Sequence, residues 1–159
     1  MDTRWLDDDE EKAYLGLVAV AELLPGALDA QLRRDSGLTH FEYLVLAMLS
    51  EATDRTLRMT SLAQRTNATL PRLSHVVRRL EERGLVERFP GPEDGRATNA
   101  RLTEQGWDTI VAAAPGHVET VRRLAFDPLT PTQVAQLRRI SDSMLEVLDP
   151  DGHMTRRSG

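Results

Sequence analysis

Apolar residues recur every three or four positions along most of the chain, which is the period of one buried face of an α-helix. The longest stripe runs from Asp9 to about Arg34 and predicts a long first helix. We expect a kink at Pro25, because proline removes a backbone donor and clashes with the preceding turn. Gly37 follows the last turn as a stop signal. The apolar positions of this stripe are Tyr14, Leu17, Val18, Ala21, Leu24, Leu28 and Leu32.

Shorter helices follow the first one. Thr39 and Glu42 have the spacing of a capping box and predict the start of a second helix. A very short strand is predicted at residues 57–59, and Thr60 is expected to cap a short third helix. The next helix begins near Thr69, only a few residues later. Two helices at so short a separation are typical of a helix-turn-helix.

The segment after that helix changes to the alternating pattern of strands. Gly84 ends the helix, residues 85–89 alternate as a half-buried strand, and residues 97–102 form the returning strand. Proline and glycine residues between the two strands predict a hairpin tip. A winged DNA-binding unit has these parts in this order, with a helix for the major groove and a hairpin arginine for the minor groove.

Two further helical stripes complete the chain. One begins at Thr103, and we expect a kink or a break at Pro115-Gly116; the other opens with a capping box between Thr130 and Gln133. The predicted fold is mainly α with a small β-wing: a winged helix-turn-helix flanked by N- and C-terminal dimerisation helices. A small winged domain cannot cover the stripes of these helices, which favours an intertwined homodimer; a monomeric bundle is the alternative.

Composition excludes several classes of protein. At 159 residues the chain fits one domain, or one domain plus a dimerisation element. There is no run of 18 uncharged apolar residues and no signal-peptide pattern, so we expect a cytoplasmic protein that does not contact a membrane. The absence of cysteine excludes disulfides, cysteine-based zinc sites and thiol sensing. The four histidines lack ligand spacing, so no metal and no cofactor are predicted.

The sequence also lacks the usual signs of an enzyme. It contains no glycine-rich phosphate loop, no recognisable Ser/His/Asp arrangement and no cysteine nucleophile. The charge distribution indicates a binding function instead. Residues 55–106 contain ten Arg and six Asp/Glu, a net charge of +4, whereas the remainder contains ten Lys/Arg and nineteen Asp/Glu, a net charge of −9. A local cationic patch on an acidic body is typical of a nucleic-acid binder.

The helix that follows Thr69 carries most of the candidate chemistry. Arg72, His75 and Arg79 lie on one face, and arginine can donate paired hydrogen bonds to guanine. Thr69 and Ser74 are suited to phosphate oxygens. The alternative interpretation is a solvated charged face. In that case Glu81 and Glu82 pair with nearby arginines, and a pair between Arg78 and Glu82 is expected.

The hairpin loop strengthens the DNA-binding interpretation. Asp94 precedes Arg96 by two residues and can hold the arginine side chain extended. An arginine at a hairpin tip can enter a narrow A·T-rich minor groove. The alternative is an ordinary polar hairpin, but the position of this loop directly after a basic helix and a strand favours a wing.

The stretch TSLAQRTNATLPRLSHVVRRLEERGLVERFPGPEDGRATNARLTEQG resembles the winged helix-turn-helix of MarR-type transcriptional regulators. The matching motifs are the junction at residues 80–86, the wing at residues 94–96 and the exit into the next helix at residues 102–106. The resemblance covers residues 10–148, after an acidic segment at residues 1–9 and before a flexible tail at residues 149–159. Within it, the winged unit spans about residues 39–103, and the dimerisation helices span about 10–35 and 104–148.

The resemblance implies a homodimeric, sequence-specific DNA-binding repressor. Its two recognition helices would enter successive major grooves of a pseudo-palindromic site on double-stranded DNA. His75 stands where the family often has arginine, so the base preference does not carry over. The DNA-binding residues that we predict are Thr69, Pro71, Arg72, Ser74, His75, Arg78, Arg79, Asp94, Arg96 and Thr98.

The family also implies a small, often aromatic ligand, bound between the dimerisation helices and the winged unit, that releases the DNA. For each candidate that could line such a pocket, an ordinary core position is the favoured interpretation. A protein-interaction module with the same winged fold but without DNA binding is the alternative function. The candidate ligand-binding residues are Phe41, Tyr43, Met48, Met59 and Trp107.

Overall fold

The computed structural model describes residues 1–93 and 95–155. Asp94, predicted at the wing tip, and residues 156–159 of the predicted tail lie outside the described residues. Short helical turns at Thr53–Arg55 (3-10) and Arg122–Phe126 (π) join the longer elements. These elements are α1 (Asp8–Ser36), α2 (His40–Glu51), β1 (Thr56–Arg58), α3 (Met59–Arg65), α4 (Leu70–Glu82), β2 (Val86–Pro90), β3 (Thr98–Leu102), α5 (Glu104–Val121) and α6 (Pro131–Leu148).

The three strands form one small antiparallel sheet in the order β1-β3-β2. In β2 and β3, alternate side chains face the core: Val86 pairs with Leu102, and both are buried, whereas Glu87 pairs with Arg101, and both are exposed. This alternation is why the sequence showed a period of two in these strands. The mainly helical fold with a small β-wing is confirmed.

The core of the winged unit lies between this sheet and the helices α2, α3 and α4. Each helix contributes the face that its apolar spacing indicated, and the long stripe of α1 joins the core only near its C-terminus, at Leu32. Nine large side chains of this core are fully buried, as expected of a close-packed interior. The largest fully buried ones are Leu32, Leu38, Leu46, Leu49, Leu62, Leu73, Leu80, Val45 and Val77.

Helix starts follow the predicted caps, with one error. The capping box of Thr39 with Glu42 and that of Thr130 are both confirmed. Thr60 does not cap α3: this helix begins one residue earlier, at Met59, and has no side-chain cap. β1 runs directly into α3, so the extended backbone of Arg58 is itself the cap position, and no loop separates the two elements.

The two internal prolines are accommodated inside helices. α1 runs unbroken through Pro25, and α5 runs through Pro115, so the break considered at Pro115-Gly116 does not occur. A proline removes only one hydrogen bond, and the turns on either side keep theirs. The helical path changes after Val121 instead, in the π turn at Arg122–Phe126 that precedes α6.

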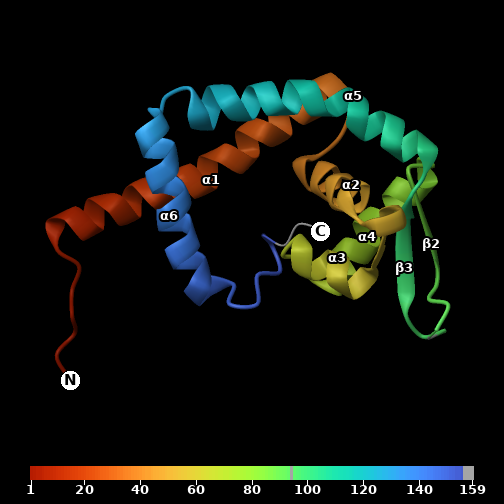
Figure 1. Cartoon of the computed structure of the whole chain (residues 1–159), viewed down its shortest axis with the longest axis horizontal. Coiled ribbons are helices and arrows are strands. Elements are labelled where there is room, and N and C mark those ends of the chain that lie inside the picture. Colours follow the sequence, from red (N-terminus) through yellow and green to blue (C-terminus); the bar gives the residue numbers. More distant parts are fainter. Residues whose placement is uncertain (94, 156–159) are drawn as a thin grey trace.

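The long helices lie outside the winged unit. α5 runs along the top of this unit, α1 extends from it away from the sheet, and α6 crosses α1 on the side far from the sheet (Figure 1). None of the residues of α6 is buried, and large apolar side chains are open to solvent on both α1 and α6, among them Leu23, 73% exposed, and Ile140, 53% exposed. A groove of about 660 Å³ runs between these two helices and has a mostly apolar lining.

α1 has a second property that the sequence analysis did not anticipate. By length and composition alone it could cross a membrane, since an 18-residue window has a mean hydropathy of 1.4, with 6% of that window buried. The same features occur in a helix whose apolar face is covered by another protein chain. Large apolar side chains from Tyr14 to Leu23 of α1 are exposed in this chain.

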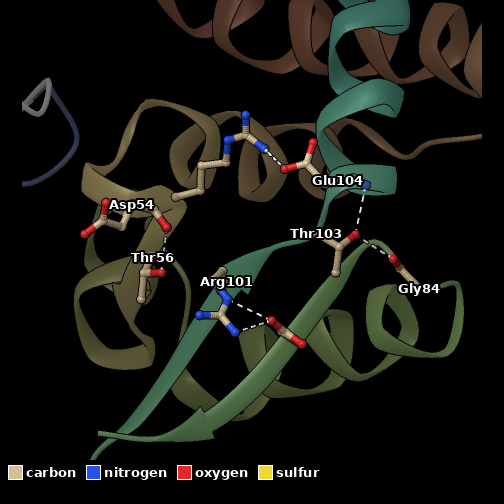
Figure 2. A network of polar contacts seen from close by, with 9 residues as sticks. Asp54, Thr56, Gly84, Arg101, Thr103 and Glu104 are labelled. Atoms are coloured by element: carbon tan, nitrogen blue, oxygen red, sulfur yellow. Dashed lines mark hydrogen bonds and ion pairs between the residues drawn. The ribbon is translucent and has the colours of Figure 1, made fainter. Parts of the chain in front are cut away.

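The start of α5 is fixed tightly to the wing. The Thr103 hydroxyl donates to the Gly84 carbonyl (2.7 Å) and accepts from the Gly106 N–H (3.0 Å), as Figure 2 shows. Gly106 is buried, and a Cβ added there would lie 2.1 Å from the Leu85 carbonyl oxygen. Only glycine permits this approach. The wing and the long helices are therefore connected through a rigid junction.

Candidate nucleic-acid interface

The N-terminus of α4 is well defined. The Thr69 hydroxyl caps the helix by accepting from the Arg72 N–H at 3.3 Å. Pro71 occupies the second helical position, where its missing N–H leaves no hydrogen bond unmade. The first turn of α4 is thus stable without any partner from outside the winged unit, which suits a helix that presents its N-terminus to another molecule.

The outward face of α4 is cationic and exposed. Arg72, His75, Arg78 and Arg79 are all exposed, while Leu73 on the opposite face is fully buried. The guanidinium of Arg72 lies over the Phe41 ring of α2. The structure therefore brings the four predicted basic residues together on one face of one helix.

His75 and Arg78 contact each other on this face. One guanidinium nitrogen of Arg78, Nη2, lies 3.2 Å from His75 Nδ1. When Arg78 donates to Nδ1, the ring proton is on Nε2, which leaves one donor directed outward. The pair between Arg78 and Glu82 expected from the sequence is absent from the ion pairs of the described residues. Helical spacing allows Arg78 to contact either Glu82 or His75, and the contact with His75, three residues earlier, is the one that forms.

Arg88 is a residue of this site that the sequence analysis missed. It projects from β2 onto α4, donates to Glu81 through Nε at 2.5 Å, and donates to the Ser74 hydroxyl through Nη1 at 3.1 Å. Ser74, predicted as a phosphate ligand, therefore already accepts one hydrogen bond. Its own O–H remains a donor. Two features of the sequence could have indicated this role. Arg88 lies on a strand predicted to be half-buried, and an acidic residue, Glu81, precedes it by seven positions.

A shallow hollow of about 310 Å³ separates α4 from the wing. Pro71 and Ser74 of α4 line it on one side and Thr98 of β3 on another, with Arg88 between them. Three of the predicted DNA-binding residues thus share one concave surface. Arg96 lies near the end of the hairpin, whose strands are closed by the Gly91 N–H donating to the Ala97 carbonyl at 2.7 Å.

The predicted ligand-binding residues do not share one neighbourhood. Tyr43 packs against the His117 ring, with 4.2 Å between ring centres, and Trp107 lies under the Arg55 guanidinium at 4.1 Å. Met59 lines the hollow between α4 and the wing, and Met48 and Phe41 pack against the core. Among the described residues, each of the five is a side chain of the core or its edge.

Polar groups are buried where α1, α2 and α5 meet. His40 and His117 stack with ring centres 6.4 Å apart. Burial lowers the pKa of both rings. For His40 the nearby Asp29 carboxylate partly opposes this lowering, and for His117 the nearby His40 ring lowers the pKa further. His117 Nδ1 and the oxygen of the Gln31 amide have no hydrogen-bond partner among the described residues. This junction thus favours neutral histidines at physiological pH.

Comparison with known proteins gives the family. The sequence model of the MarR family matches residues 38–98, which span α2 to the start of β3. The DNA complex of Sco3205, a MarR family transcriptional regulator from Streptomyces coelicolor, superposes with a TM-score of 0.89 and 42% identity, over 94% of this chain and 93% of that one. The chain belongs to the MarR family. The resemblance noted in the sequence is therefore confirmed over the flanking helices as well.

Other relatives differ in how much they share. The HTH-type transcriptional repressor IacR of Pseudomonas putida is 41% identical over 81 residues, which are 51% of this chain and 46% of that protein. The chain spans about half the length of the first curated relatives that it matches. CouR from Rhodococcus jostii RHA1, solved with p-coumaroyl-CoA bound, matches at 27% identity with a TM-score of 0.74, over 93% of this chain and 97% of that one. IacR and Sco3205 are thus both regulators of transcription.

Proposed function

We propose that this MarR-family protein is a cytoplasmic homodimer that binds a pseudo-palindromic site on double-stranded DNA and represses transcription until a small molecule releases it. The observation that carries the DNA-binding part is the exposed cationic face of α4. Arg72, His75 and Arg79 project from it, and the wing with Arg96 extends beside it. One helix for the major groove and one hairpin arginine for the minor groove are the parts that each subunit of a dimeric winged-helix protein needs to bind one half-site.

The homodimer is supported by the apolar surface of the long helices. Leu23 of α1 and Leu137 and Ile140 of α6 line the groove between these helices and remain exposed in a single chain. Contiguous exposed apolar surface of this kind marks a protein interface. A second copy that contributes the same two helices would cover the surface and place two α4 helices on one face of the assembly.

Repression and its release by a ligand are supported by the relatives. IacR is a repressor, and CouR has been solved with p-coumaroyl-CoA bound. In this chain the unpartnered His117 nitrogen and Gln31 oxygen give the junction of α1, α2 and α5 polar groups that a small molecule could satisfy. We therefore propose this junction as the place to look for a small aromatic ligand.

Selection of bound duplexes from a random DNA pool tests the DNA-binding part directly. We expect two copies of one half-site with centres about 10 base pairs, or a multiple of that, apart, because a two-fold symmetric dimer reads one face of the duplex. Enrichment of no sequence, with equal retention of Arg79→Ala and the unsubstituted chain, would overturn the proposal.

Sedimentation equilibrium tests the dimer. Ile140→Glu places a carboxylate in the apolar groove and should yield monomers. Arg138→Glu introduces the same group two positions earlier, on a side chain that is 82% exposed and outside the groove, and should leave the dimer intact. A monomeric unsubstituted chain, or equal behaviour of the two variants, would contradict an interface built on α1 and α6.

A further inference from the structure

An aromatic ring of α2 lies against an arginine of α4. The guanidinium carbon of Arg72, in the first turn of α4, is 4.1 Å from the centre of the Phe41 ring, in the first turn of α2. We propose that Phe41 is a positioning residue of the DNA interface, which holds the Arg72 guanidinium in the orientation presented to DNA. The inference rests on the proposed contact of α4 with DNA and adds a positioning residue outside that helix.

The geometry leaves the hydrogen-bonding edge of Arg72 available. The N–H donors of a guanidinium lie in its plane, so a ring that covers one face does not occupy them. Such a contact is attractive because the ring face carries negative charge density. Phe41 can therefore restrict the rotamers of Arg72 without consuming any donor that a guanine or a phosphate would accept.

Both partners of the contact are fixed by their own helices. The capping box of Thr39 and Glu42 sets the first turn of α2 on either side of Phe41, and the Thr69 cap sets the backbone of Arg72. The carboxylate of Glu42, a side chain only 5% exposed, also pairs with Arg83 at the end of α4, at 3.4 Å. Adjacent residues of α2 thus hold side chains from both ends of α4.

The other arginine that stacks at the same distance shows what distinguishes Arg72. Arg55 lies 4.1 Å from the centre of the Trp107 ring, but it also donates to Glu104 at 2.9 Å, so its charge is neutralised. Among the described residues, no carboxylate pairs with Arg72. An aromatic ring orients the cation while leaving its full charge for an anionic partner.

The contribution is expected to be modest and specific. A cation–π contact at an exposed site changes an equilibrium by about two- to fivefold, and pre-ordering a flexible arginine acts in the same direction. Phe41→Leu should therefore weaken binding to the selected duplex by roughly this factor for each α4 helix bound. The chain keeps all its positive charge, so the salt dependence of binding should not change.

The test measures affinity for the selected duplex by fluorescence anisotropy, using the full chain. The variants are Phe41→Leu, Phe41→Tyr, Arg72→Ala and the Phe41→Leu/Arg72→Ala double variant, with Arg55→Ala as the matched control for an arginine stacked elsewhere. Thermal unfolding of each variant checks that the fold is retained. We expect Phe41→Leu to bind more weakly, Phe41→Tyr to bind normally, and Phe41→Leu to have no further effect once Arg72 is absent. Arg55→Ala should bind normally.

The outcomes separate this inference from the proposed function. Normal binding by Phe41→Leu, alongside weakened binding by Arg72→Ala, would overturn the positioning role and leave the DNA contact of Arg72 standing. A loss in Phe41→Leu that persists in the double variant would also overturn it, since Phe41 would then act through the fold. If Arg72→Ala and Phe41→Leu both bind normally, the proposed contact of Arg72 itself is wrong.

Discussion

The arginines of α4 and those of the wing sheet are held in opposite ways. Around the sheet, Arg88 pairs with Glu81, Arg101 with Glu87 and Arg55 with Glu104. On the outward face of α4, Arg72 stacks on a phenylalanine and Arg78 bonds a histidine. Carboxylate partners neutralise the arginines around the sheet, whereas the partners on α4 leave the positive charge in place.

This difference teaches how an acidic protein presents a cationic surface. The chain has a net charge of −5, so its carboxylates would weaken any contact with phosphates if they were spread evenly. Figure 2 shows Arg101 and Glu104 among the ion pairs at the sheet and the start of α5. Because the carboxylates there pair with nearby arginines, the face of α4 that we propose for DNA binding keeps its positive charge.

The largest predicted effect is a difference in the free energy of unfolding between substitutions on the two faces of α4. Leu80 is fully buried, and Leu80→Ala should lower the free energy of unfolding by roughly 2–5 kcal/mol because it leaves a cavity. Arg79→Ala, on the exposed face next to it, should change this free energy by no more than about 0.5 kcal/mol. Urea unfolding followed by circular dichroism measures both. A large stability loss in Arg79→Ala would show that this face is structural.

A smaller effect should distinguish the two ion pairs of β2. The Arg88–Glu81 side chains are 28% and 30% exposed, and those of Arg101–Glu87 are 48% and 51% exposed. Arg88→Met leaves a half-buried carboxylate without its partner and should cost roughly 1–3 kcal/mol of stability. Arg101→Met should cost at most about 1 kcal/mol, because exposed pairs contribute little. Equal losses in denaturant unfolding would contradict the ranking by burial.

The smallest predicted effect is on the pH dependence of stability. The arginines of α4 stay charged at the surface, whereas the histidines at the junction of α1, α2 and α5 are kept neutral by burial. The folded pKa of His40 and of His117 lies below the ordinary histidine value of 6.5, chiefly because of burial. The unfolded chain therefore binds more protons just below that pH, so stability rises with pH there and is lost as pH falls below about 6.5. Thermal unfolding from pH 7.5 to 5 measures this loss, which His117→Phe should reduce. An unchanged profile in the variant would show that His117 does not contribute.

Most of the winged unit was predictable because local signals and the tertiary fold agree there. The Thr39–Glu42 box, the Thr69 cap and the stop at Gly84 each act within a few residues, and the exposed face of α4 followed from its period. The Thr60 cap was wrong because β1 runs directly into α3 without a loop.

Contacts between elements were not predictable from period or spacing. Arg88 reaches α4 from β2, and Phe41 meets Arg72 from a helix 31 positions earlier in the chain. Phe41 was predicted for a ligand pocket only because the family resemblance implies one. That prediction stays untested; the contact of its ring with Arg72 depends on how α2 and α4 cross, which spacing along the chain does not give.

Salt dependence of binding to the selected duplex is the most direct test that the cationic face of α4 meets DNA. Arg79→Gln should weaken binding and reduce the magnitude of the slope of log affinity against log salt by about 0.9 for each phosphate that Arg79 neutralises. Arg101→Gln removes the same charge from the sheet, where Glu87 already neutralises it at 2.7 Å, and should leave both quantities nearly unchanged. Equal changes in the two variants, or none in Arg79→Gln, would contradict the proposal that the exposed face of α4, and not the ion-paired sheet, meets DNA.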